Sequence, residues 1–380
     1  MANIVYLQGG GPTAVINTSF LGVLKAAKEE KANLFCSGYG LEGLISGKLE
    51  KIDLDKDYSF LKRRPGSFFG SARISLKKNP EYLPMILKTL KEEKIDLLLL
   101  NGGNDTMDSA LRIHEACRKE KLPVHVLGIP KTIDNDLYGT DRCPGFLSAA
   151  KCVIYNIHAI LVDDLSYRKG RINVIEVMGR DNGSLAASTS LPLSDDIIPD
   201  FIYVPEVPFN TKEAIQKAKR VFEEKGRCNI VVSEGIHDEE GKNIAAVGQK
   251  DSFGNVQLGG VSSYLSDLFR KEGIKTRGIE LSIPQRAAFY LQSDYDLRDA
   301  FLCGKMAVKE GSSHSGLMIG IDKTADFSFS YHLADLETAS GNAKPMSLSY
   351  VSKEKDFIDK SFREDYEELI LSSPREGVGF

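Results

Sequence analysis

The sequence predicts an α/β protein built from two interleaved, doubly wound lobes. Short apolar runs alternate with helix-length amphipathic segments through most of the chain, as in repeated strand–helix–strand units. The runs are rich in Val, Ile and Leu instead of strictly alternating with polar residues, which is typical of parallel strands buried on both faces. The length of 380 residues exceeds one usual domain, yet no linker or low-complexity tract divides the chain. In such folds, ligands bind beyond the carboxyl ends of the strands.

The expected elements follow from these periodicities. The strands are expected at 3–8, 95–101, 124–129, 172–178, 229–234, 279–283 and 316–321. The helices are expected at 81–94, 105–121, 146–165, 211–226 and 261–273, where apolar residues recur at three- and four-residue steps. Another helix should start near Thr13. From about residue 335 the pattern weakens, and only 365–374 indicates a further short helix.

Composition narrows the class of protein. The formal net charge is −4 and no Lys- or Arg-rich block stands out, which disfavours nucleic acid as a partner. No basic signal region begins the chain and no apolar stretch reaches the length of a membrane span, so we expect a cytoplasmic protein with no membrane partner. The cysteines are scattered and are expected to be reduced thiols that fill the core: Cys36, Cys117, Cys143, Cys152, Cys228 and Cys303.

The first informative strand-to-helix turn is "LQGGGPTAVIN". Its glycines, Gly9, Gly10 and Gly11, let the chain turn sharply and let a phosphate approach backbone N–H groups at a helix N-terminus. The motif matches neither the P-loop nor the dinucleotide fingerprint. A tight turn with no ligand explains it equally well.

The second turn is "LLLLNGGNDTMDSA". Gly102 and Gly103 again free the backbone, and Asn104, Asp105 and Thr106 offer oxygen atoms at the start of a helix. Helix capping accounts for one acidic residue here. It accounts less well for a second glycine-rich strand end in the same sheet.

The third turn, "LGIPKTIDNDLYG", carries a cation and two carboxylates. Lys131 follows a strand, and Asp134 and Asp136 are two residues apart, so in extended chain both would point to one face. A solvated loop is the alternative. A lysine beside an aspartate suits phosphoryl transfer to an alcohol, since the transferred group needs a cation and the hydroxyl needs a proton acceptor.

Six ordered blocks resemble the phosphofructokinase family over about residues 3–320. They are "GSFFGSAR", "GGNDT", "PKTIDND", "VIEVMGR", "PEVPF" and "VVSEG". The resemblance implies a donor-binding lobe of residues 1–146 plus about 285–330, and a sugar-phosphate lobe of 147–284 plus about 331–380. It also implies an active site in the cleft between the lobes.

The resemblance implies reversible phosphorylation of the 1-hydroxyl of fructose 6-phosphate. Asp134 would be the general base, and the catalytic set would be Asp134, Thr132, Arg180 and Lys131. The phosphoryl donor would meet Gly10, Gly11, Gly103, Asp105, Lys131 and Arg73. The sugar phosphate would meet Thr132, Ile133, Asp134, Asp136, Arg171, Met178, Gly179, Arg180, Glu234, Arg277 and Arg286, with Arg171 reaching across a subunit contact of a homodimer or homotetramer. Surface salt bridges are the alternative reading of any one of these arginines.

The donor is expected to be pyrophosphate. Family members that use ATP commonly have glycine where this chain has Asp105 and Lys131. An Asp105 side chain would repel the α-phosphate of a nucleotide by bulk and charge, whereas Lys131 would neutralise a small, highly charged donor. An ATP-dependent enzyme is the alternative.

Two departures from the family bear on the ligands. The aspartate that the family associates with magnesium is Asn104 here, so Mg²⁺ is expected at Asn104 and Asp105 with its remaining ligands from phosphates and water. Ile283 replaces a histidine or tyrosine that touches the sugar phosphate. Leu21 replaces a basic residue of the bacterial effector site, so nucleotide regulation of that type is not expected.

Two further classes of function stay open on the sequence alone. Asn104 and Ile283 could mark a non-catalytic, sugar-phosphate-binding regulatory subunit, although the intact "TIDND" and "MGR" argue against it. A dinucleotide-dependent dehydrogenase is disfavoured by the incomplete glycine fingerprint. The sequence leaves open the direction of flux and the acceptance of other sugar phosphates such as sedoheptulose 7-phosphate.

Overall fold

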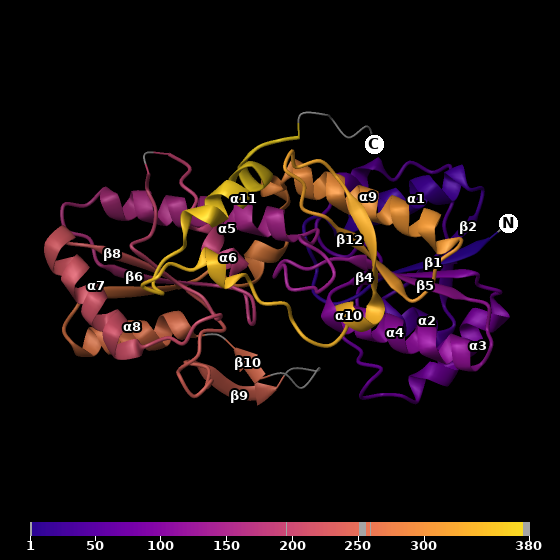
Figure 1. The fold of residues 1–380 in the computed structure, drawn as a ribbon, viewed down its shortest axis with the longest axis horizontal. Helices are drawn as coiled ribbons and strands as arrows, with labels where there is room; N and C mark the ends of the chain where they lie inside the picture. Colours follow the sequence, from indigo (N-terminus) through magenta and orange to yellow (C-terminus); the bar gives the residue numbers. More distant parts are fainter. Residues whose placement is uncertain (1, 195, 251–255, 259, 375–380) are drawn as a thin grey trace. The chain divides into compact units, whose positions relative to one another are not determined.

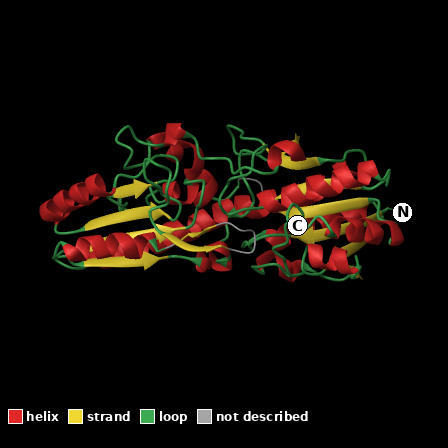
Figure 2. Cartoon of the chain, turned by 90° about the horizontal axis from the view of Figure 1, so that it is seen from below, coloured by secondary structure: helices red, strands yellow, loops and turns green. Residues whose placement is uncertain are grey.

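The computed structural model describes residues 2–194, 196–250, 256–258 and 260–374. The chain divides into two compact units, and each combines strands with flanking helices (Figure 2). Unit 1 consists of the described residues within Met1–Ser148, Arg286–Ala343 and Ser373–Phe380. Unit 2 consists of those within Ala149–Gln285 and Lys344–Ser372. The expected α/β class with two lobes interleaved along the chain is confirmed.

The described part of unit 1 contains a seven-stranded sheet with the order β13-β12-β5-β4-β1-β2-β3. The strands are β1 (Asn3–Gln8), β2 (Asn33–Ser37), β3 (Leu49–Lys51), β4 (Leu97–Gly102), β5 (His125–Pro130), β12 (Leu317–Ile321) and β13 (Tyr331–Asp335). The inner pairs are parallel, but β3 and β13 pair antiparallel at the two edges. The strands that the sequence predicts in this unit all pair in parallel, whereas the antiparallel edge strands β3 and β13 were not expected. An antiparallel edge strand on an otherwise parallel sheet is common.

Helices cover both faces of this sheet, with α1 and α9 on one side and α2, α3, α4 and α10 on the other (Figure 1). Alternate residues of β1 enter different cores: Ile4 and Tyr6 pack toward the first side, and Val5 and Leu7 toward the second. The helices are α1 (Ile16–Glu29), α2 (Leu41–Ser46), α3 (Tyr82–Glu92), α4 (Asn104–Lys119), α9 (Asp294–Gly311) and α10 (Leu336–Ala339), with 3₁₀ turns at η1 (Ser59–Arg63) and η3 (Phe289–Leu291).

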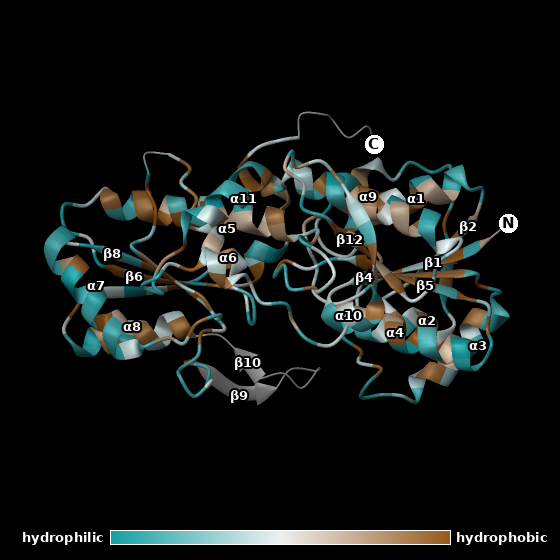
Figure 3. Ribbon diagram, viewed as in Figure 1, coloured by the Kyte–Doolittle hydropathy of each residue, from teal (hydrophilic) through white to brown (hydrophobic). Residues whose placement is uncertain are grey.

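Unit 2 is built on a four-stranded parallel sheet with the order β11-β6-β8-β7. In Figure 3, β6 and β8 carry hydrophobic residues, and α7 and α8 mix hydrophilic with hydrophobic residues. The strands are β6 (Ile172–Val177), β7 (Phe201–Tyr203), β8 (Cys228–Ser233) and β11 (Thr276–Glu280), and β9 (Ala246–Lys250) pairs separately with β10 (Val256–Leu258). The helices are α5 (Phe146–Leu165, beginning in unit 1), α6 (Ser184–Ser188), α7 (Thr211–Lys225), α8 (Val261–Lys271) and α11 (Lys360–Leu371), with η2 (Ile283–Arg286) and η4 (Leu348–Tyr350).

Every expected strand is present, but some boundaries and elements differ. The strand expected at 279–283 is Thr276–Glu280, because residues from Ile283 form a 3₁₀ turn. The first helix begins at Ile16 instead of near Thr13, and the last spans Lys360–Leu371 instead of 365–374. Helix α9 was not expected. Its buried face includes Asp296, Arg298 and Asp299. These charged residues interrupt the apolar periodicity by which a helix is recognised in the sequence.

The expected lobes and the two compact units divide the C-terminal part of the chain differently. Residues 331–343 were assigned to the second lobe, but β13 pairs with β12 and completes the sheet of unit 1. Residues 344–372 do belong to unit 2. The end of the expected segment, 375–380, lies outside the described residues.

Helix α5 corrects the expectation that no segment reaches the length of a membrane span. It has 20 residues, and its most apolar 18-residue stretch has a mean hydropathy of 1.3. Of that stretch, 56% is buried in the protein. A mostly buried core helix meets the same criteria of length and composition. The six cysteines are all free and buried, which confirms their expected place in the core, and burial raises the pKa of Cys117 to about 11.

Candidate active site

Three loops meet at the carboxyl edge of the unit 1 sheet. They follow β1, β4 and β5, which are adjacent and parallel, so the three turns singled out in the sequence share one edge. The Ser71 hydroxyl donates to the carbonyl of Gly10 over 2.7 Å, and Ala72 pairs with Gly9. This contact brings the loop that carries Arg73 to the same edge.

Lys131 is the most buried charge at this edge, with 3% of its surface exposed. Its Nζ donates to the carbonyl of Gly11 over 2.8 Å, which links the loop after β5 to the glycine loop after β1. The pKa of Lys131 is lowered to about 8, first by burial and then by Arg286 and Arg73, while Asp134 and Asp136 act in the opposite direction. Three cations thus face this edge, an arrangement that an anion would stabilise.

The glycines of these turns serve two different purposes. A Cβ atom at Gly102 would lie 2.1 Å from Oγ1 of Thr106, and one at Gly9 would lie 2.5 Å from the same atom. Both positions must be glycine because α4 packs against the turns, so the tight-turn reading holds there. A Cβ at Gly10 would instead meet Nζ of Lys131 at 3.3 Å, and one at Gly11 would meet the Arg286 guanidinium at 3.9 Å. Gly10 and Gly11 therefore lie beside the cations. Thr106, which the sequence singles out as an oxygen donor, packs its side chain against both Gly9 and Gly102.

The loop that carries Asp134 and Asp136 is not extended. Asn135 between them has a left-handed backbone with φ of 58°, so the argument that places both carboxylates on one face of an extended chain does not apply. The loop is fixed by its own contacts instead. Thr132 Oγ1 accepts a hydrogen bond from the backbone N–H of Asp134 over 3.1 Å. Asp134 and Asp136 both act on the pKa of Lys131, and Ile133 is buried beneath the loop.

Asn104 ties the second loop to the third. Its Nδ2 donates to a carboxylate oxygen of Asp136 over 2.8 Å. Its own amide oxygen is buried and accepts no hydrogen bond within the described part of the chain. Asp105 follows in the first turn of α4 and is exposed, and Gly103 caps that helix. An amide oxygen and a carboxylate are oxygen ligands that suit Mg²⁺. Among residues 2–194, 196–250, 256–258 and 260–374, no cluster of three or more His, Cys, Asp or Glu side chains forms a metal site.

The carboxyl edge of the unit 2 sheet brings together the "MGR" and "SEG" segments. Gly179 donates its backbone N–H to the Glu234 carboxylate over 3.4 Å, and the hydroxyl of Ser233 donates to the carbonyl of Gly179. Met178 donates its backbone N–H to the side chain of Gln285 over 3.2 Å. A Cβ atom at Gly235 would lie 1.7 Å from the carbonyl oxygen of Arg180, so only glycine fits this approach. Arg180 and Glu234 therefore lie on adjoining, mutually fixed turns.

Two predicted arginines lie at the opposite edge of the same sheet. Arg171 precedes the first residue of β6, and Arg277 pairs in register with Asn173 near that amino end. Met178 follows the last residue of β6. Six residues of strand separate the two sets, or roughly 20 Å. Within one chain, Arg171 and Arg277 are therefore not brought together with Arg180 and Glu234.

Comparisons with known proteins agree with this architecture. The family model described as Phosphofructokinase matches residues 3–309. The chain is 34% identical to a pyrophosphate–fructose 6-phosphate 1-phosphotransferase of Xanthomonas campestris pv. campestris, over 97% of this chain and 91% of the relative. It is 29% identical to a sulfofructose kinase of Alkalicoccus urumqiensis, over 92% of this chain and 91% of the relative.

A solved structure extends the similarity to three dimensions. The crystal structure of a pyrophosphate-dependent phosphofructokinase from Nitrosospira multiformis has a TM-score of 0.86 and 28% sequence identity. The similarity covers 100% of this chain and 95% of that one. Because the family match covers most of the sequence and most of both sheets, the chain belongs to the phosphofructokinase family.

Proposed function

We propose that the protein transfers a phosphoryl group reversibly between pyrophosphate and the 1-hydroxyl of fructose 6-phosphate. The observation that carries the proposal is the buried Lys131, which is fixed on the Gly11 carbonyl and lies within electrostatic reach of Asp134 and Asp136. The relatives' names support the choice of donor and acceptor. We assign Asp134 as the base that accepts the proton of the attacking hydroxyl.

Lys131 and Arg286 stabilise the charge of the transferred group. Phosphoryl transfer needs little covalent chemistry from the protein, so positioned charge supplies most of the acceleration. Arg73 and the backbone of Gly10, Gly11 and Gly103 complete the donor site. Thr132 and Ile133 complete the loop that carries the base, Asp134.

The donor is pyrophosphate because of the side chains around its site. Lys131 is nearly inaccessible to water, so its charge acts at close range and with little screening. Asp105 lies in the first turn of α4, where a longer donor would have to pass a second negative charge. A compact donor avoids this repulsion.

Mg²⁺ fits this site as a partner of the donor. Asn104 and Asp105 would hold it, and the buried amide oxygen of Asn104 that accepts no hydrogen bond from the described residues supports the assignment. When bound, the ion would neutralise donor oxygens. The protein supplies too few charged ligands for a closed metal cage, so donor oxygens and water would complete the shell.

Six residues are assigned to the acceptor: Met178, Gly179, Arg180 and Glu234 belong to unit 2, and Asp136 and Arg286 belong to unit 1. Arg180 would bind the sugar phosphate and meet charge that develops in the transition state, and Glu234 would accept a sugar hydroxyl. The hydrogen bond from Gly179 to Glu234 orients this carboxylate.

We also propose that the protein is a cytoplasmic homo-oligomer. Arg171 and Arg277 would bind the 6-phosphate of the sugar in a second copy, because both lie at the amino edge of the unit 2 sheet, opposite Arg180. Light scattering after size exclusion distinguishes a dimer or tetramer from a monomer, and a monomer that is fully active would contradict this assignment.

A coupled assay of donors and acceptors tests the proposed function. We expect turnover with pyrophosphate, Mg²⁺ and fructose 6-phosphate, and turnover with ATP reduced by about 100-fold or more if Asp105 and Lys131 exclude nucleotides. The same assay is run with sulfofructose and with sedoheptulose 7-phosphate in place of fructose 6-phosphate. Preferential use of ATP would overturn the donor assignment. Binding of fructose 6-phosphate with no turnover on either donor would identify a regulatory subunit instead.

A further inference from the structure

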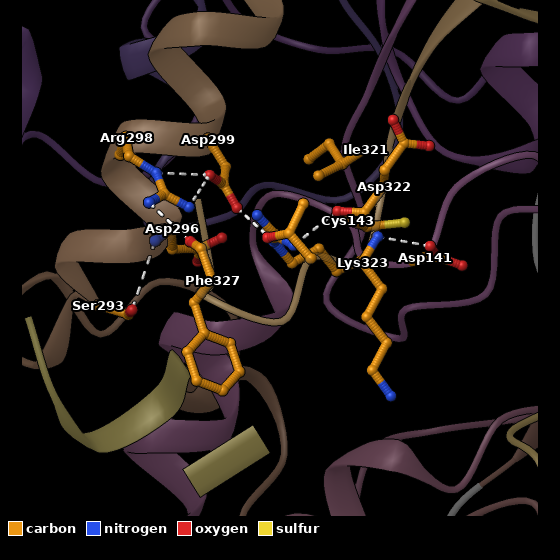
Figure 4. Close-up of polar contacts among 12 residues, drawn as sticks. Asp141, Cys143, Ser293, Asp296, Arg298, Asp299, Ile321, Asp322, Lys323 and Phe327 are labelled. Atoms are coloured by element: carbon orange, nitrogen blue, oxygen red, sulfur yellow. Dashed lines mark hydrogen bonds and ion pairs between the residues drawn. The ribbon is translucent and has the colours of Figure 1, made fainter. Parts of the chain in front are cut away.

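A buried carboxylate at the start of α9 contacts a different helix. Asp296 is 1% exposed. One of its oxygens accepts the backbone N–H of Gly145 over 2.8 Å, and the other accepts the backbone N–H of Ser148 over 2.9 Å. Ser293, the N-cap of α9, donates its backbone N–H to the hydroxyl of Ser148 over 3.1 Å. Ser293, Asp296 and Asp299 follow one another along the first turns of α9 (Figure 4).

The two N–H groups belong to the beginning of α5. This helix starts at Phe146, so Gly145 and Ser148 occupy its N-cap and third positions. The first N–H groups of a helix have no partner within that helix. An aspartate usually caps the helix on which it lies, but Asp296 caps α5 from α9. The carboxylate therefore fixes the start of one helix on another.

The same segment holds the loop that carries Asp134. Thr132 donates its backbone N–H to the carbonyl of Pro144 over 3.2 Å and forms a β-bridge with Gly145. Asn135 accepts the backbone N–H of Cys143 through its side-chain oxygen over 2.9 Å. Residues 143–148 thus lie between Asp296 and the loop. Pro144 and Cys143 form hydrogen bonds with the loop, and Gly145 and Ser148 form hydrogen bonds with Asp296.

The glycine loop after β1 packs on the same point. A Cβ atom at Gly145 would lie 2.8 Å from the methyl carbon of Thr13 and 3.1 Å from the carbonyl oxygen of Thr132. A shift of Gly145 would therefore be transmitted to both loops. Asp299 has a different function, because it forms ion pairs with Arg142 over 2.6 Å and with Arg298 over 2.8 Å.

We propose that Asp296 is a positioning residue for phosphoryl transfer: by holding Gly145 and Ser148, it fixes the loop from which Asp134 acts. The inference rests on the proposed function only for its kinetic consequence. Both carboxylate oxygens are needed, because each accepts a different N–H group. Burial raises the pKa of Asp296 to about 6, with Asp299 adding to the rise, while the hydrogen bonds from Ser148 and Gly145 oppose it. The carboxylate is thus kept at this place at an energetic cost, and the N–H groups offset part of it.

The substitution Asp296→Asn tests the proposal, since an amide has one acceptor oxygen and leaves one N–H group without its partner. We expect kcat to fall by about ten-fold, with the KM values for pyrophosphate and fructose 6-phosphate changed by less than about two-fold, because misplacement of a reacting group slows chemistry more than binding. We also expect faster amide hydrogen exchange in peptides that cover 131–136 and 143–148. Asp200→Asn is the control: Asp200 also accepts a backbone N–H, from Asn229 over 2.8 Å, but it lies in unit 2 before β7. It should leave both readouts unchanged.

Two results would overturn the proposal: a folded Asp296→Asn protein with wild-type kcat, or a lower kcat with unchanged exchange in 131–136. If that variant does not fold, Ser148→Ala removes the hydroxyl that accepts from Ser293 and interacts with the Asp296 carboxylate, but it keeps the backbone N–H that Asp296 accepts. It should lower kcat by a smaller factor and speed exchange in 143–148, and no change in either would also overturn the proposal. If the wild-type protein shows no phosphotransferase activity, the proposed function fails, and hydrogen exchange in Asp296→Asn still decides whether the loop is held.

Discussion

The two units hold their charged side chains in different ways. In unit 1, Lys131 is 3% exposed and its Nζ is fixed on a backbone carbonyl. In unit 2, Arg277 is exposed on the outermost strand of its sheet, and Arg171 is half-buried before β6. A buried, fixed cation meets its ligand with little loss of side-chain entropy, whereas an exposed arginine must be ordered when the ligand binds.

The contrast between fixed and exposed side chains follows the edges of the sheets more closely than it follows the two units. The carboxyl edge of unit 2 is also fixed, since Gly179 binds both Glu234 and Ser233. At its amino edge, Arg277 is exposed and Arg171 is half-buried. Preorganised groups are the ones that accelerate a reaction, so we expect substitutions at the carboxyl edges to lower kcat and substitutions at the amino edge to raise KM.

The largest effect is expected for Asp134→Asn. Loss of a general base costs about 10²- to 10⁴-fold in rate, so kcat should fall by about 1,000-fold while both KM values change little. Steady-state kinetics with pyrophosphate measures this. Asp141→Asn is the control, because the Asp141 carboxylate accepts the backbone N–H of Lys323 over 2.6 Å outside the proposed site. Near-normal turnover of Asp134→Asn would remove this residue from the role of base.

Lys131→Met should have the second largest effect, about 100-fold in kcat/KM for pyrophosphate, because a buried charge-assisted contact to the donor is lost. The pKa of Lys131 is about 8, so the ammonium form disappears as pH rises through that value. The wild-type kcat/KM for pyrophosphate should therefore decline above about pH 8, in excess of any change in the variant.

The matched variant corrects for the ionisation of the donor itself, since both proteins meet the same pyrophosphate species at each pH. Lys119→Met, an exposed position at the end of α4, should behave as the wild type. Identical pH profiles for wild type and Lys131→Met would contradict the role of the lysine in binding the donor. The contrast between a fixed cation in unit 1 and an exposed arginine in unit 2 would then have no functional meaning.

Much of the fold could be predicted because the inner strands are buried on both faces. Runs such as Leu97–Gly102 are short, mostly apolar and followed by glycine, and this length and flanking sequence distinguish a buried strand from a helix. The short edge strands β3 and β13 lack this signal, since their exposed residues do not form an apolar run. Helix α9 was not predicted because its buried face is polar: Asp296 and Asp299 pair with groups distant in sequence, and Arg298 pairs with Asp299.

The site was predictable where it depends on turns and not where it depends on partners. The loops after β1, β4 and β5 meet because parallel neighbours end at one edge, which the strand pattern implies. The sequence has no signal for the bond between Lys131 and Gly11, which are 120 positions apart. It also gives no signal for the order of strands in unit 2.

The smallest single effect is expected for Arg277→Gln, and it offers the sharpest test of the amino edge. A hydrogen bond to a charged group contributes about 1.5 kcal/mol, so KM for fructose 6-phosphate should rise by about ten-fold with kcat nearly unchanged. Arg270→Gln, a surface arginine paired with Asp267 over 2.5 Å, is the control.

If Arg171 and Arg277 serve a second copy, a hybrid of Asp134→Asn with the double variant Arg171→Gln/Arg277→Gln should contain one intact site. Co-expression with two affinity tags would isolate that hybrid, and its activity at low fructose 6-phosphate should exceed that of either parent. A hybrid no more active than the mean of its parents would mean that the arginines do not serve a second copy. Binding within their own chain is incompatible with the register of β6 and β11. The assignment of both residues to the sugar phosphate would then be wrong.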